Sequence, residues 1–425
     1  MNKLVALYLA AIVALPVFAE PAEEQSSSDA VTTDAKEEFI SEERTEEGFL
    51  THYLNNAIAS GMKKVDENEK VQYGRKITDY VSAPKFGGYF IGKYAYSSRE
   101  GDDSGDGFTQ RMTRLYIDGT ILEDFAYRVQ MQVSNSTFHM KDYFIEWRRF
   151  PELKVKIGQF KRAFGLENPM NPWDVGTGDY SQLTKKLSGY TDFIGVEASN
   201  NGGRDQGIQL QGDLFPIGKD KHRFVHYQIM VSNGQGINTK DANSRKDVSG
   251  TLQFQPIKGL IVGMYGWTGN FTYEGVTVSR NRYDIVASYD KNDWTVRAEY
   301  AHSTGSKIKS KDLFVNHLVM HNGTVAGTYG EMKKQYYAGG SDRADAWYIT
   351  MGIPCTSWLK TYLKYDVYRD DATWGTTRSI YSIAPNIQLH KNLMFQPQFN
   401  YVHDRSAASG KRNFCELWVE SYVRF

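Results

Sequence analysis

The sequence has little cysteine, and it has no long hydrophobic run beyond its first 20 residues. Cys355 and Cys415 are its 2 cysteines among 425 residues, too few for a disulfide framework. They are free or paired with each other, and we favour free thiols. A membrane-spanning helix needs about 20 consecutive apolar residues, and no run after the first 20 residues approaches that length. A helical membrane protein is therefore excluded.

The chain also lacks net charge and contains little proline. Lys and Arg number 50 and Asp and Glu number 50, which gives a formal net charge of +0. Nucleic-acid binders carry a basic excess, so we expect no nucleic-acid partner. Only 11 Pro stand against 28 Tyr and 38 Gly, a composition that favours many strands. A membrane barrel remains compatible with it, because barrel strands alternate an apolar and a polar face.

The N-terminus has the three parts of a secretory signal peptide. Lys3 supplies a positive charge, residues 4–17 are apolar, and Val17-Phe18-Ala19 forms a cleavage site of the small-residue type. We expect residues 1–19 to be removed and the mature chain to lie outside the cytoplasm.

Residues 20–84 are predicted to form an acidic, partly helical periplasmic segment. Its first part, residues 20–47, is rich in Glu, Ser and Thr and cannot bury a core. Apolar residues then recur at helical spacing over 46–70, which predicts a short amphipathic helix. The helix is an appendage or linker, or alternatively a pore plug or an assembly segment.

From Lys85 onward, apolar and polar residues alternate with a period of two. About sixteen such segments follow, and tight turns alternate with longer polar loops between them, apart from a short connection at Ser136-Thr137. This pattern predicts an all-β fold, a transmembrane antiparallel β-barrel over residues 85–425. The predicted strands are 85–97, 108–121, 124–135, 138–149, 153–160, 205–215, 223–233, 247–257, 260–270, 277–290, 293–302, 344–355, 358–369, 377–390, 393–404 and 413–425.

The facing of individual strands does not by itself separate a membrane barrel from a soluble one. Val129 and Met131 share one face of their strand, while Arg128 and Gln130 share the other. The apolar face points outward in a membrane and inward in a soluble barrel. The signal peptide and the strand number favour the membrane. Sixteen closed strands leave a lumen too wide for side chains to fill, so we expect a wet pore lined by the polar set.

The last ten residues form an amphipathic strand that ends in an aromatic residue, Phe425. This ending resembles the signal that the outer-membrane assembly machinery recognises. We therefore expect that machinery, outer-membrane lipid and lipopolysaccharide as partners, and the outer membrane of a Gram-negative bacterium as the location. Phe425 should close the last strand against the first, near Lys85.

The block from Lys156 to Glu167, Lys-Ile-Gly-Gln-Phe-Lys-Arg-Ala-Phe-Gly-Leu-Glu, resembles the phosphate-selective porins of the O and P type. Ala163 stands where proline is common in the family, whereas the flanking Gly-Gln-Phe-Lys and Phe-Gly-Leu-Glu match. The stretch Arg204 to Gly212 is also similar. The resemblance implies a sixteen-stranded homotrimeric porin whose loop after the fifth strand, residues 161–204, folds into the pore. The length of this loop agrees, because connections this long are usually functional or disordered.

Positive residues gather near this loop and are candidates for selecting the solute. Pore selectivity arises from charges of one sign near the narrow zone. Acidic residues on inward faces oppose them, so the alternative is a salt-bridged wall that only stiffens the barrel. The candidate anion-attracting residues are Arg114, Arg128, Arg148, Lys154, Lys156, Lys161, Arg162, Lys185 and Lys186. The opposing carboxylates are Asp118, Glu146, Asp213, Asp284, Glu299, Asp366, Glu416 and Glu420.

Aromatic residues toward strand ends predict interfacial girdles, with a stacking track for sugars inside the lumen as the alternative. These residues are Tyr94, Tyr96, Trp147, Tyr265, Trp267, Trp294, Trp347 and Trp418. The nine His lack zinc-ligand spacing and no Gly-x-Ser-x-Gly motif occurs, so we expect no enzyme, metal or cofactor.

Two functions remain. The first is an outer-membrane porin for passive diffusion of small hydrophilic solutes, including anions such as phosphate or polyphosphate. The second is a non-conducting barrel used for adhesion or assembly. The physiological solute and the role of the acidic N-terminal segment do not follow from the sequence.

Overall fold

A computed structural model describes residues 82–99, 106–134, 137–190, 202–241, 243–273, 276–304, 343–408 and 410–425. The predicted signal peptide lies outside the described residues. So does nearly all of the predicted periplasmic segment, and so does the stretch 191–201 of the long loop.

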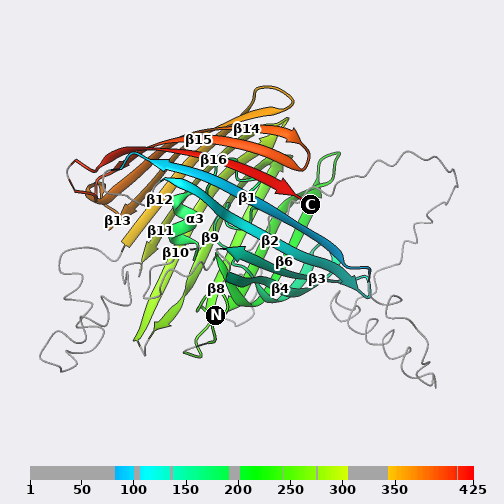
Figure 1. Ribbon diagram of the computed structural model, residues 1–425. Helices are drawn as coiled ribbons and strands as arrows, with labels where there is room; N and C mark the ends of the chain where they lie inside the picture. Colours follow the sequence, from blue (N-terminus) through cyan, green and yellow to red (C-terminus); the bar gives the residue numbers. More distant parts are fainter. Residues whose placement is uncertain are drawn as a thin grey trace, which may run out of the picture. The chain divides into compact units, whose positions relative to one another are not determined.

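The described strands form one closed antiparallel barrel in which each strand pairs with its neighbours in sequence (Figure 1). Strand β16 pairs with β1, and the ring closes where Gly88 and Phe425 exchange backbone hydrogen bonds of 2.9 and 3.0 Å. Closure leaves no unpaired sheet edge. The elements are β1 (Lys85–Ser97), β2 (Gly107–Ile121), β3 (Phe125–Ser134), β4 (Thr137–Phe150), β5 (Leu153–Lys161), α3 (Gln182–Leu187), β6 (Arg204–Ile217), β7 (His222–Ser232), β8 (Asp247–Ile257), β9 (Leu260–Tyr273), β10 (Val276–Lys291), β11 (Trp294–Thr304), β12 (Arg343–Pro354), β13 (Leu359–Asp370), η2 (Trp374–Thr376), β14 (Thr377–His390), β15 (Leu393–Asp404) and β16 (Asn413–Arg424).

The prediction of a sixteen-stranded barrel is confirmed, and the predicted strands agree with the observed ones to within a few residues. Asn292 and Asp293 make one of the tight turns with φ of 52° and 63°, the conformation that suits the twist of a two-residue hairpin. One expected longer connection, 271–276, is instead short, because β9 extends to Tyr273 and β10 begins at Val276. Among the described residues, no helix is long and apolar enough to cross a membrane.

Burial in this barrel is inverted relative to a soluble protein. Leu115 and Ile157 are 39% and 52% exposed on the outer face, whereas Arg114 and Lys156 on the inner face are 3% and 1% exposed. The apolar face therefore points away from the barrel axis, as a hydrocarbon surrounding requires. This arrangement settles the question of facing that strand alternation leaves open.

Local irregularities displace particular side chains toward the lumen. The register shifts between Ile91 and Gly92 where β1 meets β2, and between Gln130 and Met131 where β3 meets β4. Such bulges let two consecutive residues oppose one and change which way side chains point. Gly158 in β5 has φ of +135°, and a Cβ there would lie 2.2 Å from the carbonyl oxygen of Tyr143. Only glycine fits this position.

Candidate functional site

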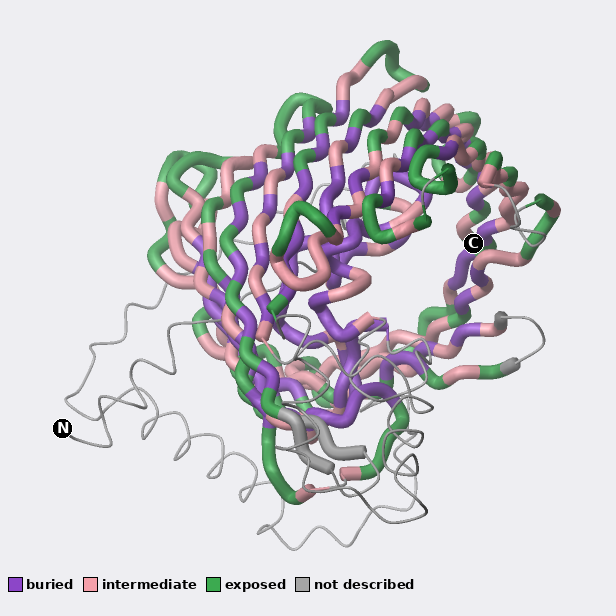
Figure 2. Tube along the Cα trace, turned by 90° about the vertical axis from the view of Figure 1, so that its left-hand side faces the viewer, coloured by how far each residue is buried: buried purple, intermediate pink, exposed green. Residues whose placement is uncertain are grey.

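Residues 162–203, called the inner loop below, leave β5 and return to β6, and their described part lies inside the ring of strands (Figures 1 and 2). The ends of this part meet in a neck. The N–H of Arg162 donates to the carbonyl of Gly203 at 2.7 Å, and the N–H of Gly203 donates to the carbonyl of Gly189 at 3.2 Å. The described part of the loop thus has its two ends joined by hydrogen bonds beside the start of β6.

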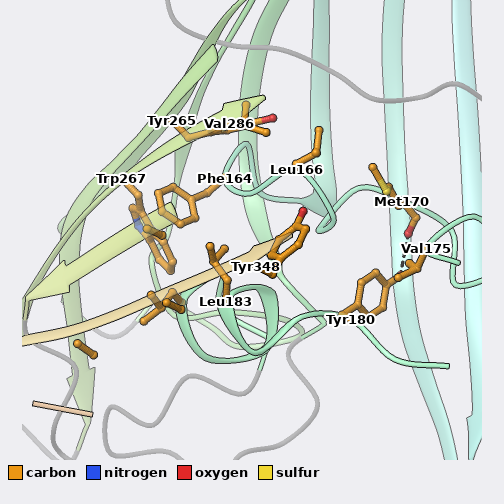
Figure 3. Close-up of a cluster of buried hydrophobic side chains, with 14 residues drawn as sticks. Phe164, Leu166, Met170, Val175, Tyr180, Leu183, Tyr265, Trp267, Val286 and Tyr348 are labelled. Carbon is orange, nitrogen blue, oxygen red and sulfur yellow. Dashed lines mark hydrogen bonds between the residues drawn. The ribbon is translucent and has the colours of Figure 1, made fainter. Parts of the chain in front are cut away.

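An apolar patch on the inner wall receives the loop (Figure 3). Three wall alanines, Ala301, Ala344 and Ala346, are completely buried, and their small side chains let α3 approach β11, β12 and β13. Burial of apolar surface is the main source of stabilisation for such packing. The cluster joins Phe164, Leu166, Met170, Val175, Tyr180, Leu183 and Leu187 of the loop to Tyr265, Trp267, Val286, Ala301, Ala344, Ala346 and Tyr348 of the wall.

This patch corrects one prediction about the aromatic residues. Tyr265 and Trp267 were expected in an interfacial girdle, but they are 4% and 2% exposed and lie in the cluster under the loop. The girdle assignment is wrong for both. The alternation within β9 already indicated that both residues face inward. Val262 and Met264 occupy the outward positions of this strand, at 38% and 52% exposure, and Tyr265 and Trp267 have the opposite parity.

Polar contacts tie the loop to the same side of the wall. Glu167, on the loop, lies 2.9 Å from the ammonium of Lys364 and accepts the N–H of Ser181 at 2.6 Å. Asp366 accepts the N–H of Gln182 at 2.9 Å, at the first residue of α3. Hydrogen bonds from buried backbone groups to ionised partners are among the stronger kinds. Removing any one of these wall side chains should leave buried loop groups unsatisfied.

On the opposite side, the loop reaches β2 and β16 through a chain of charges. Asp179 pairs with Lys185 and lies 3.7 Å from Arg111. Arg111 in turn lies 2.7 Å from Glu420, and Lys93 lies 3.6 Å from the same carboxylate. Burial raises the pKa of Asp179, but the charges of Lys185 and Arg111 outweigh it and hold the pKa at about 2.

Four basic side chains gather on the inner wall at the outer ends of β2 to β6, and we call them the basic cluster. Arg204 grips Asp142 with two hydrogen bonds of 2.8 Å. Lys141 and Lys161 lie within electrostatic reach of both Arg114 and Arg204. Asp142 is the carboxylate paired with this group.

Tyrosine side chains border the basic cluster. Arg114 donates to the hydroxyl of Tyr89 at 2.7 Å. The ammonium of Lys161 lies 5.7 Å from the centre of the Tyr180 ring. Tyr190 packs on Tyr180, with their ring centres 5.0 Å apart. The loop therefore presents hydroxyl-bearing rings toward the most positive part of the wall.

Toward the periplasmic ends of these strands, the inward cations are each matched by carboxylates. Lys154 and Lys156 face the lumen as predicted, but both are in ion pairs. The pairs are Arg128 with Asp118 at 2.7 Å, Lys156 with Glu146 at 3.2 Å, and Lys154 and Arg223 with Asp213 at 3.1 and 2.9 Å. Formal charges nearly cancel in this lower part of the wall.

The remaining predicted site residues are placed as follows. Arg162 is buried at the loop neck beside Asp205, at 2.7 Å, and Lys186 lies 6.0 Å from the ring of Tyr368. Arg148 was expected to face inward with Arg114 and Arg128, but it is exposed near the periplasmic end of β4. The register shift between Trp147 and Phe150 interrupts the alternation there.

Sequence reasoning missed Lys93, Arg111, Lys141 and Arg204. Arg111 and Lys141 lie close to the two register shifts, which carry no reliable signal in one sequence. Arg204 opens the stretch that already resembled the porin family. Among the residues that the structure describes, no group of three or more His, Cys, Asp or Glu side chains could hold a metal ion.

The closed ring of sixteen strands with a loop folded inside defines a porin barrel. Residues 88–260 match the family described as phosphate-selective porin O and P, which confirms the resemblance found at Lys156 to Glu167. On this basis, the chain is an outer-membrane porin of a Gram-negative bacterium. A search of curated proteins finds no match.

Solved structures with the same architecture include three outer-membrane proteins. An anion-selective porin from Comamonas acidovorans superposes with a TM-score of 0.58 and 12% identity, over 81% of this chain and 99% of that one. The outer membrane channel DcaP of Acinetobacter baumannii superposes with a TM-score of 0.53 and 11% identity, over 83% of this chain and 99% of that one. The trimer form of OmpT from Vibrio cholerae superposes with a TM-score of 0.51 and 10% identity, over 82% of this chain and 100% of that one. At these identities, the likeness establishes the fold.

Proposed function

We propose that the chain forms a water-filled channel for small hydrophilic solutes that prefers anions, and that the basic cluster produces this preference. The supporting observation is the uneven distribution of charge along one wall. The guanidinium groups of Arg114 and Arg204, which stay charged, and the amino groups of Lys141 and Lys161 lie beside the carboxylate of Asp142. The lower wall, by contrast, is nearly neutral. The electric field from a local excess of charge of one sign, near the narrowest part of a pore, is the usual origin of its ion selectivity.

The cluster suits anions that carry several oxygen acceptors, phosphate among them. Arginine presents a planar fork that bonds two oxygens, and lysine acts as a point charge. The phosphate-selective family and the similarity to an anion-selective porin of Comamonas acidovorans support the sign of the preference. Of the candidate anion-attracting residues expected from the sequence, we assign the role in selectivity to those at the outer ends of β2 to β6.

Single-channel recording of the purified protein in planar bilayers tests the function. We expect conductance, and in a KCl gradient a reversal potential of anion-selective sign. Absence of conductance in correctly folded protein would support the non-conducting barrel for adhesion or assembly instead. A cation-selective potential would remove the role of the basic cluster but leave the channel.

We further propose a homotrimer, in contact with lipid and lipopolysaccharide, that the assembly machinery inserts through β16. A trimer form is described for OmpT of Vibrio cholerae, and the exposed apolar residues of the outer face provide the surface for lipid and for neighbouring subunits. Native mass measurement of detergent-solubilised protein should give three chains.

A further inference from the structure

The neck of the inner loop packs on a single tryptophan. Trp267 of β9 is 2% exposed on the inner wall. Its ring lies 5.9 Å from the ring of Phe164 in an edge-to-face arrangement (Figure 3). A Cβ on Gly189, at the far end of the neck, would lie 3.4 Å from the Trp267 ring. Both ends of the described loop therefore converge on this side chain.

Three guanidinium groups surround the Trp267 ring. The central carbons of Arg162, Arg282 and Arg280 lie 4.0, 4.5 and 4.7 Å from its centre. A cation near the face of tryptophan is attracted by the ring quadrupole, and more strongly when water is excluded. All three arginines are at most 4% exposed, so the ring contributes to holding like charges together in a dry site.

Each of these contacts continues into the loop or its base. Arg162 is the first residue of the loop, and it pairs with Asp205 at 2.7 Å. Arg282 donates to the carbonyl of Leu187, the last residue of α3, at 2.5 Å. The loop is thus held on the ring at its start and at the end of its helix.

The indole N–H fixes the orientation of the ring. It donates to Asp247 at 2.8 Å, and the same carboxylate lies 3.0 Å from Arg280 and accepts the N–H of Asn270 at 2.8 Å. A hydrogen-bonded indole cannot rotate without breaking this contact. Asp205 pairs with Arg162 and Asp247 pairs with Arg280, whereas Arg282 donates to the hydroxyl of Ser303 and to the carbonyl of Leu187. The uncharged Trp267 ring lies between the three guanidinium groups.

We propose that Trp267 is a positioning residue that holds the neck of the inner loop closed through its arginine contacts and so sets how far the loop narrows the channel. The predicted effect of Trp267 on conductance rests on the proposed channel function. The predicted effect on how firmly the loop is held does not depend on that function. Each dry cation–π contact that is lost should raise the fraction of time that the loop spends released by on the order of tenfold, and Trp267→Leu removes the ring from all three arginines.

The test measures loop release directly through a thiol at position 188. Ser188 is completely buried, and Ser188→Cys in a Cys355→Ser, Cys415→Ser background places one thiol inside the closed neck. Reaction of this thiol with a water-soluble maleimide should be slow in the parent, faster by a factor of about ten or more with Trp267→Leu, and close to the parent rate with Trp267→Phe, which keeps a ring face. Arg282→Gln should also accelerate the reaction and serves if Trp267→Leu does not fold.

Trp347→Leu is the matched control. The guanidinium of Arg369 lies 5.1 Å from the Trp347 ring, so the same kind of contact is lost in a strand position outside the loop cluster. This variant should leave both thiol reactivity and conductance unchanged. Parent-like reactivity in Trp267→Leu and Arg282→Gln would overturn the proposal, as would equal acceleration by Trp347→Leu.

Conductance separates this inference from the proposed function. If the parent conducts, Trp267→Leu should show a larger and noisier open-channel current than Trp267→Phe. Unchanged current together with accelerated thiol reaction would mean that the neck opens without widening the channel, which would refute the conductance part. If the parent does not conduct, the channel proposal fails, whereas the thiol result still decides the role of Trp267.

Discussion

Opposite changes to the tight ion pair in the basic cluster should shift ion selectivity in opposite directions. The cluster contains the basic side chains of Arg114, Lys141, Lys161 and Arg204 and the carboxylate of Asp142. Asp142→Asn raises its net charge by one unit, and Arg204→Gln lowers it by one unit. The double variant restores the net charge of the parent.

The magnitude follows from Coulomb's law. A unit charge about 8 Å from a passing ion in water changes the ion's energy by roughly 0.5 kcal/mol, or about twofold in local concentration. Because the same charge raises the local anion concentration and lowers the cation concentration, we expect the ratio of chloride to potassium permeability to rise about fourfold in Asp142→Asn and to fall about fourfold in Arg204→Gln. The double variant should match the parent protein.

The assay is the reversal potential in a KCl gradient, with ionic strength kept near 0.1 M because the screening length there is about 10 Å. Breaking a buried ion pair on one side costs about 3–5 kcal/mol of stability, so only protein with the heat-modifiable gel migration of a folded barrel should be recorded. Asp345→Asn is the matched control, because Asp345 also receives two hydrogen bonds from one arginine, of 2.7 and 2.5 Å, outside the basic cluster.

The outcome that would refute this reasoning is specific. Shifts of the same sign in Asp142→Asn and Arg204→Gln would mean that altered structure, rather than charge, sets the potential. A double variant that fails to return to the parent ratio would lead to the same conclusion. A shift in Asp345→Asn of equal size would show that the field at the cluster is not what the permeating ion senses.

Three further predictions concern the wall and the loop. Lys156→Gln should move the reversal potential less than Arg204→Gln, since Lys156 lies in the lower wall beside Glu146 and outside the basic cluster; an equal shift would contradict the localisation of selectivity. Gly158→Ala should sharply reduce the folded fraction on heat-modifiability gels, because strained backbone costs about 1–3 kcal/mol even before the 2.2 Å approach of the added Cβ to a carbonyl oxygen; normal folding would show that the backbone relaxes there. The pKa of Asp179, about 2 against a usual 3.8, means that its ion pairs persist from neutral pH down to about 3.8 and are lost as the pH falls toward 2. The contribution of the Asp179 ion pairs to channel current should therefore be constant over the upper range and be lost only in the acid range, and Asp179→Asn should abolish that acid step.

The strand pattern was predictable because successive side chains of a strand point to opposite faces. In a membrane barrel one face meets lipid and the other meets the lumen along the length of each strand, so the alternation is regular. The same alternation placed Lys154 and Lys156 in the lumen. It could not show that Glu146 and Asp213 come from neighbouring strands to neutralise them. Pairing across strands depends on register, and a sequence that fixes facing does not fix every partner.

The basic cluster was only partly predictable for a related reason. Arg114 and Lys161 were identified from their positions, whereas Lys141 enters the cluster close to the register shift between Gln130 and Met131. A bulge changes the parity of every residue after it. The structure, not the alternation rule, therefore decides which side of the wall such a residue occupies. Arg162 shows the converse, because it was expected to select ions and is instead buried at the loop neck.

The sequence by itself determined that the chain folds as a barrel of about sixteen strands, with its last strand closing on its first. That information is local, since period-two alternation, turn residues and the terminal Phe425 can each be read within a few positions. The tertiary structure decided which face points outward, where the inner loop rests and which charges remain in excess. These outcomes depend on residues far apart in the chain, such as Glu167 and Lys364, meeting inside a closed ring, and no local pattern encodes that meeting.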